Sequence, residues 1–324
     1  MVARAVRAYD PKTVRLPHFS PATGRQVALV SVICFALLVV SGGAVRLTGS
    51  GLGCPDWPSC FQHHLTAVSS FHPIVEFTNR LVSAAVTLVS VAAFAVTTLR
   101  RPPRRVLTLL AAGLVAGIVA QIVLGGLVVL FKLNPYLVAL HFVLTIAILA
   151  DAIVLYHLSG NQPTRARLVI GRDLLLLARL QLSTLTLVTV LGTVVTGAGP
   201  HAGGPGAKRI PIAFRDITEV HSTVALFLIG VTLASQFAFH HAQAPQVVLR
   251  RGRMFIEVMA LQGALGYLQY FLHDAAWVVE FHLAGVTTLW ITGIGFYLSL
   301  HRHPPEATNA APSSWPADAV AAGT

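Results

Sequence analysis

Residues 121–141 read QIVLGGLVVLFKLNPYLVALH, and residues 262–282 read QGALGYLQYFLHDAAWVVEFH. Both stretches begin with glutamine, carry glycine at the fifth position and end with histidine, so the pattern recurs without a gap after 141 positions. Each stretch contains the end of one apolar segment, a short turn and the start of the next segment. A pattern that is kept across two segments and their turn indicates that the chain consists of two similar halves.

A second correspondence extends the repeat to the rest of each half. His221 lies 142 positions after Asn79, and Thr48-Gly49-Ser50-Gly51 is echoed by Thr196-Gly197-Ala198-Gly199. Chance agreement of a few residues is the alternative. The number of positions that agree favours a tandem repeat.

The composition places both halves in a membrane. Of the 324 residues, 55% are hydrophobic and 11% are charged, and the mean hydropathy is +0.71, whereas soluble domains carry about 25% charged residues. A helix needs about 20 mainly apolar residues to cross the hydrocarbon core. The sequence therefore predicts an all-α polytopic membrane protein, whose eight transmembrane helices form two tandem, pseudo-symmetric four-helix bundles of the same orientation. The expected spans are 26–45, 74–98, 106–131, 136–158, 174–197, 216–239, 252–272 and 276–300.

The positions of lysine and arginine predict the orientation. With the N-terminus inside, the cytoplasmic segments hold sixteen of these residues and the outer segments hold five, namely Arg46, Lys132, Lys208, Arg209 and Arg215. Cytoplasmic loops carry such an excess in membrane proteins, so both termini are expected in the cytoplasm of a bacterial cell whose plasma membrane the chain spans. The net charge of +11 does not indicate nucleic-acid binding, because the charges lie in short clusters between apolar runs.

The expected organisation has five parts. A cytoplasmic segment at 1–25 precedes an N-terminal four-helix half at 26–158, a cytoplasmic linker at 159–173, a C-terminal half at 174–300 and a cytoplasmic tail at 301–324. The tail is rich in alanine and proline and is expected to be disordered. The run at 26–45 also admits a reading as a cleaved signal peptide, but its removal would break the repeat.

Three histidines, His141, His221 and His282, lie about five residues inside the outer ends of their spans, and Asn79 has the same depth. A polar group within a span is costly and normally faces the bundle interior, where it is paired or liganded. An interhelical hydrogen bond explains one such histidine, but three at one depth favour ligation. No two share a helix, which suits a haem between imidazoles better than a tetrahedral zinc ion.

The two halves differ in their ligands. His221 and His282 are predicted to hold a haem as a bis-imidazole pair. In the first half His141 faces Asn79, and an amide is a poor ligand for iron. One site is thus complete, as a permanent redox cofactor requires, and the other is open, as a substrate or a transient haem requires.

The glutamines and glycines of the repeat have two readings. Gln121 with Gly125, and Gln262 with Gly266, lie one turn apart on one helix face. Glycine there permits close approach by a porphyrin or by a neighbouring helix.

Glu76, Asn79 and Arg80 share one face of the second span. In one reading Glu76 and Arg80 neutralise each other as an ion pair. In the other, Glu76 moves protons or stabilises positive charge at the open site, and Arg80 pairs with a haem propionate.

Cys54 and Cys60 lie six positions apart in the first outer loop, on the oxidising side of the membrane. A disulfide is the default expectation there, and a catalytic or electron-transferring dithiol is the alternative. Cys34, alone within the first span, is expected to be a packed apolar residue.

These residues resemble the haem A synthase family. The resemblance rests on the run from Gly42 to Cys60, on Glu76-Phe77-Thr78-Asn79-Arg80, on Gly199-Pro200-His201-Ala202-Gly203, and on the histidines that open spans four, six and eight. Many family members have a fourth histidine where this chain has Asn79, so the chain resembles the actinobacterial kind. A second outer cysteine pair of some members is absent, since residues 198–215 contain no cysteine.

The resemblance implies an oxidoreductase that converts the position-eight methyl of haem O to a formyl group by successive hydroxylations. It also implies haem b (iron protoporphyrin IX) on His221 and His282, haem O as substrate in the first half, and Glu76 as the catalytic residue. Haem O synthase and terminal oxidase assembly are the expected partners beside membrane lipid, and the sequence leaves a homo-oligomer open. The alternatives are a transmembrane cytochrome b between quinol and an outer acceptor, and a two-repeat transporter. A transporter would have broken spans and a midplane site, unlike this chain.

Overall fold

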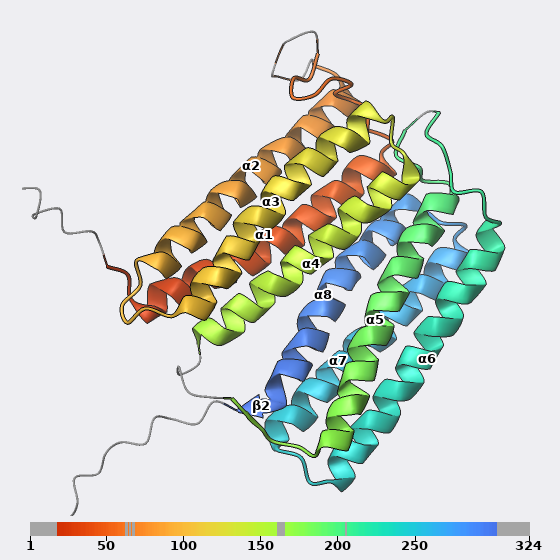
Figure 1. Ribbon diagram of the computed structural model, residues 1–324. Coiled ribbons are helices and arrows are strands. Elements are labelled where there is room, and N and C mark those ends of the chain that lie inside the picture. The colour runs from red at the N-terminus through yellow and green to blue at the C-terminus, as the bar shows by residue number, and fades with distance from the viewer. Residues whose placement is uncertain are drawn as a thin grey trace, which may run out of the picture.

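The computed structural model describes residues 18–61, 64, 66, 69–160, 166–204 and 206–302, which are mainly helical (Figure 1). The predicted all-helical fold is confirmed over these residues. The helices are α1 (Pro21–Leu47), α2 (Phe71–Thr98), α3 (Arg105–Leu130), α4 (Pro135–Ser159), α5 (Arg172–Ala198), α6 (Phe214–His241), α7 (Gln246–Phe271) and α8 (Ala276–Ser299). Two short strands, β1 (Arg167–Leu168) and β2 (His301–Arg302), complete the elements.

Seven of the eight described helices are long and apolar enough to cross a membrane. The exception is α7, which is 26 residues long. It begins with a basic segment and carries Glu257, Gln262 and Gln269 farther along, so its mean hydropathy is lower. The chain is therefore a multi-pass membrane protein, and the predicted eighth span rests on the length and packing of α7.

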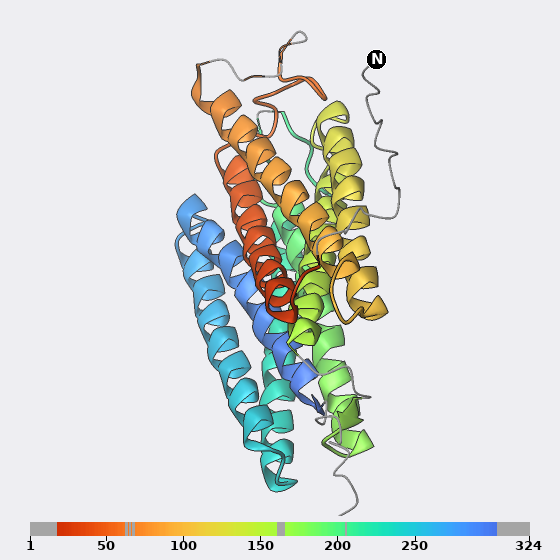
Figure 2. The same ribbon diagram turned by 90° about the vertical axis from the view of Figure 1, so that its left-hand side faces the viewer.

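The helices contact one another in two rings. α1 contacts α2 and α4 while α3 contacts both of these, and α5 contacts α6 and α8 while α7 contacts both of these. Within the described residues, α2 does not contact α4, and α6 does not contact α8. These helices therefore lie diagonally across their groups, and α8 lies beside α1 and α4 to join the two groups (Figures 1 and 2).

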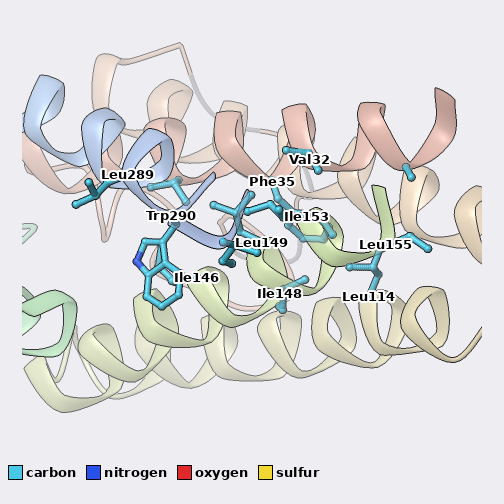
Figure 3. Packing of buried hydrophobic residues seen from close by; sticks show 14 of the residues in the cluster. Val32, Phe35, Leu114, Ile146, Ile148, Leu149, Ile153, Leu155, Leu289 and Trp290 are labelled. Carbon is cyan, nitrogen blue, oxygen red and sulfur yellow. The ribbon is translucent and has the colours of Figure 1, made fainter. Parts of the chain in front are cut away.

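The main hydrophobic core lies at this junction. Phe35 of α1 and Leu149 of α4 are fully buried, and Trp290 of α8 packs in the same cluster (Figure 3). The Trp290 indole donates a hydrogen bond to the Thr189 hydroxyl of α5 at 3.1 Å, so its polar atom is satisfied. Large apolar side chains such as Leu88 and Phe237 are exposed on the outside of the helices, as expected of surfaces that face lipid.

Local signals set the helix starts. Ser20 accepts a hydrogen bond from the backbone N–H of Thr23 at 3.1 Å, ahead of Pro21 in the first turn of α1. Asn134 caps α4 in the same way, ahead of Pro135. Seven of the eight described helices begin one to six residues before the predicted spans, whereas α3, α7 and α8 end one residue before them.

The turn between α3 and α4 has the same backbone as the turn between α7 and α8. Lys132 and Leu133 have φ of 51° and 59°, and His273 and Asp274, 141 positions later, have φ of 52° and 59°. Residues other than glycine rarely adopt this left-handed conformation. The two turns therefore share a backbone conformation although their sequences differ.

The linker and the tail meet at a small sheet. Arg167 pairs with Arg302 and Leu168 pairs with His301 in antiparallel register, so the first two residues of the predicted tail are ordered against the linker. Residues 1–17, 161–165 and 303–324, which include the rest of the predicted tail, lie outside the described residues.

Candidate functional site

The three histidines lie near the beginning of α4, α6 and α8, at the end of the helices that carries the loop of residues 48–61 (Figure 1). Each imidazole is half-buried. In His141, His221 and His282 the Nδ1 atom is buried and has no hydrogen bond of good geometry to the described residues. Imidazole binds metals through Nε2 or Nδ1, so these three rings are candidate metal ligands.

His221 and His282 lie in the same group of helices. Their helices lie diagonally across the second group, and each histidine lies within the first eight residues of its helix. The Cε1 edge of the His221 ring faces Gly192 on α5, and the Cε1 edge of the His282 ring faces Gly266 on α7. Two imidazoles on different helices of one group would suit the ligation of a haem.

Gln121 and Gln262 are buried and form hydrogen bonds between neighbouring helices. The side-chain amide of Gln121 donates to the His141 carbonyl at 2.9 Å and to the Thr145 hydroxyl at 2.6 Å. The side-chain amide of Gln262 donates to the His282 carbonyl at 2.8 Å. The helix-packing reading of both glutamines is thus the observed one, and both fix the helix segment that carries a histidine.

Asn79 is held by the neighbouring helix α1. The Ser41 hydroxyl donates to Asn79 Oδ1 at 2.7 Å, so the amide oxygen already has a partner. An amide oxygen engaged in this way is a poorer ligand for iron than an imidazole. The first group therefore offers one clear nitrogen ligand, His141, among the predicted residues.

Glu76 and Arg80 organise the first loop. Glu76 is buried, and its two carboxylate oxygens accept from the Cys54 backbone N–H and from the Arg80 guanidinium, both at 2.8 Å. Arg80 also donates to the backbone carbonyls of Cys54, Asp56, Pro58 and Ser59. The predicted ion pair between Glu76 and Arg80 is thus present in the structure. Both side chains also bind the backbone of the loop and so join it to α2.

Cys54 and Cys60 form a disulfide, as the sequence predicted. Both residues are fully buried. Trp57, between them, lies against Gly126 of α3, where a Cβ atom would be 2.7 Å from the indole. The loop is therefore closed on itself by the disulfide and packed onto the end of α3 next to Gly125.

Arg46 connects the two halves at the loop end. Its guanidinium donates to the Thr196 and His201 carbonyls, both at 2.6 Å, and the His201 ring bonds the Asp274 carbonyl at 2.7 Å. An opening of about 260 Å³ lies beside it and is also lined by His72. Arg46 was expected only as one of the outer charges and as part of the run from Gly42 to Cys60, although its position two residues before the echoed Thr48-Gly49-Ser50-Gly51 stretch was a signal for an interaction between the halves.

A family model named COX15-CtaA and described as a cytochrome oxidase assembly protein matches residues 25–294. The chain belongs to this family. The match runs through both groups of helices and contains every predicted site residue, so the family prediction made from the sequence is confirmed.

Three relatives of this chain are proteins named "Heme A synthase". The "Heme A synthase" of Listeria welshimeri is 23% identical over 282 residues, which cover 81% of this chain and 90% of the relative. The "Heme A synthase" of Bacillus pumilus is 28% identical over 178 residues, covering 54% of this chain and 57% of the relative. The "Heme A synthase" of Geobacillus kaustophilus is 37% identical over 109 residues, covering 32% and 33%.

The burial of the disulfide separates its structural and redox readings. Because both cysteines are fully buried, we expect a water-soluble reductant to reduce the bond slowly in the folded protein and quickly after unfolding. Cys54→Ser/Cys60→Ser is expected to lose about 2 kcal/mol of stability, the loop-closure value for a short loop. Timed thiol alkylation with mass spectrometry checks the first expectation, and thermal unfolding in detergent checks the second. Rapid reduction of the folded protein would instead support the exposed, redox-active reading.

Proposed function

We propose that this chain is a haem A synthase, which oxidises the position-eight methyl of haem O to a formyl group by successive hydroxylations and loss of water. The observation that carries the proposal is the family match over residues 25–294. Relatives named heme A synthase, one of them aligned over 81% of this chain, support it.

In this proposal the second group of helices holds haem b between His221 and His282. Their diagonal placement and their buried Nδ1 atoms support the pairing. Haem b would supply electron transfer to the reaction. The protein's part is to fix both imidazoles on rigid helices and to keep the ring nitrogens that face away from the cofactor out of water.

The first group receives haem O. His141 is the residue that holds it, and the amide of Asn79 leaves the opposite side without a second imidazole. The bond from Ser41 to Asn79 supports this asymmetry. A substrate has to enter and leave, and a single strong protein ligand permits exchange more readily than two.

Glu76 acts at the first site. Its carboxylate lies one helical turn from Asn79, where it stabilises positive charge or accepts a proton as the methyl group is oxidised. Arg80 holds the loop over this region through its four carbonyl contacts, and its contact with a propionate remains part of the proposal. The structure thus gives Arg80 a second role that composition and spacing did not predict.

The proposed topology has eight spans in two tandem halves, with α7 as the eighth span and both termini in the cytoplasm. The equal turns at Lys132–Leu133 and His273–Asp274 support the repeat. The contacts of α7 with α6 and α8 support its place in the membrane, and the lysine and arginine bias supports the orientation. Haem O synthase as the source of substrate, and terminal oxidase assembly as the destination of product, belong to the same proposal.

Production in a host with and without a protohaem farnesyltransferase tests the function. Porphyrins extracted from the purified chain are identified by mass spectrometry. We expect haem b in both preparations, and haem A or its alcohol intermediate only in the host that makes haem O. Haem b alone in both would favour a plain electron-carrying cytochrome b.

A further inference from the structure

Each of the three histidine rings lies against a glycine of the preceding helix in the chain. A Cβ atom built on the glycine would lie close to the histidine Cε1 atom in all three cases. The pairs and distances are Gly125 and His141 at 3.4 Å, Gly192 and His221 at 3.2 Å, and Gly266 and His282 at 3.4 Å. The helices concerned are the sequential contacting pairs α3 with α4, α5 with α6, and α7 with α8.

We propose that these glycines are positioning residues that set where each iron-ligating imidazole stands, and that Gly192 and Gly266 thereby set the binding and electronic properties of haem b. The inference rests on the proposed function, because it takes His221 and His282 as haem ligands. Gly192 was not singled out by the sequence pattern, since it lies outside the stretch that repeats after 141 positions.

In two of the three pairs, the residue one turn before the glycine also holds the helix that carries the histidine. Gln121 and Gln262 lie four residues before Gly125 and Gly266, and their side-chain amides donate to the backbone carbonyls of His141 and His282 at 2.9 and 2.8 Å. The histidine backbone is thus held from one turn of the neighbouring helix, and its ring lies against the glycine of the next turn. This arrangement orients the imidazole in the way that outer partners orient a metal ligand.

The fourth sequential helix pair differs. α1 contacts α2, but the residue of α2 at the shared depth is Asn79, and α1 meets it with the hydroxyl of Ser41 instead of with a glycine. Helix packing alone would not require glycine opposite each histidine and a hydrogen-bonding residue opposite the asparagine. A glycine of the neighbouring helix therefore faces each of the three histidines but does not face the asparagine.

Alanine substitution separates positioning from helix stability. Alanine favours a helix over glycine, so the fold itself is not weakened where the new methyl group has room. At Gly192 the Cβ would be 3.2 Å from Cε1 and 3.7 Å from Nδ1 of His221, so the ring has to move by a few tenths of an ångström. At Gly266 the nearest approach is 3.4 Å, and the displacement is smaller.

The test compares Gly192→Ala, Gly266→Ala and the control Gly263→Ala. Gly263 lies on α7 three residues before Gly266, and a Cβ there meets only Ile229, at 4.0 Å. For each purified protein, the rate of haem b loss to an acceptor apoprotein is measured together with the electron paramagnetic resonance spectrum of the oxidised haem. We expect Gly192→Ala to lose haem about 10-fold faster, within the range for outer-partner mutations, and to shift the spectrum. Gly266→Ala should show a smaller change, and Gly263→Ala should match the wild type.

The outcomes distinguish this inference from the proposed function. A wild-type protein that holds haem b, together with Gly192→Ala and Gly266→Ala proteins of unchanged spectrum and haem loss, would overturn the positioning role alone. A wild-type protein without haem would overturn the proposed function. If Gly192→Ala fails to fold, the comparison of Gly266→Ala with Gly263→Ala still decides the question. Equal rates of haem loss and equal spectra for those two proteins contradict the inference.

Discussion

Replacement of Glu76 by alanine is expected to lower haem A formation at least about 100-fold, the usual lower bound for removing a general acid or base. Haem b content should not change, because His221 and His282 lie in the other group of helices. The substitution also removes the acceptor of the Cys54 backbone N–H and of the Arg80 guanidinium. An unsatisfied buried group lowers the free energy of unfolding by about 1–3 kcal/mol. The measurement is the rate of haem A formation per haem b.

Glu76→Gln separates the chemistry of the carboxylate from its role in the loop. An amide keeps the size of the side chain and one acceptor oxygen, so the loop and its disulfide should persist while haem A formation stays low. Glu219→Ala is the matched control, because Glu219 is an exposed acid near the same end of the second group and pairs only with Arg215 in the described residues. Haem A formation by Glu76→Gln at the wild-type rate would show that Glu76 is only an anchor.

Replacement of His221 or His282 by alanine has the second large expected effect. Either change removes one of the two proposed axial nitrogens, and we expect loss of nearly all tightly bound haem b and, with it, of haem A formation. Haem b per protein is measured by the pyridine haemochrome spectrum. His141→Ala should instead keep haem b and lose haem O binding.

The control is His240→Ala, since His240 is an exposed histidine at the opposite end of α6. It should keep both haem b and activity. Retention of haem b by both His221→Ala and His282→Ala, at the wild-type amount, would contradict the ligand assignment.

The helices could be predicted because apolar runs of sufficient length recur along the chain. The repeat, inferred from the constant spacing of glutamine, glycine and histidine, stays a prediction that the equal φ angles of the two turns support. The disulfide was readable for the same reason, because Cys54 and Cys60 are close in sequence. Hydropathy supports a membrane span least for α7, because the polar side chains of this helix lower its mean hydropathy.

Contacts between segments that are distant in the sequence could not be predicted from it. Arg80 was expected to form an ion pair or to bind a propionate, but its four loop carbonyls depend on how residues 54–59 fold back over α2. The bond from Ser41 to Asn79 and the bonds from Arg46 to the second half likewise join residues far apart in sequence. Backbone carbonyls carry no residue signature, so a sequence pattern cannot name them as partners.

A single turnover with isotopically labelled haem O tests the central claim, that one group of helices holds a resident haem while the other converts a passing one. Purified protein is loaded with the labelled haem O, supplied with reductant and oxygen, and its porphyrins are then separated by mass. We expect label in haem A or its alcohol intermediate, and an unlabelled haem b that remains bound throughout. Recovery of all the label as unchanged haem O, beside protein that is fully loaded and reduced, would contradict it.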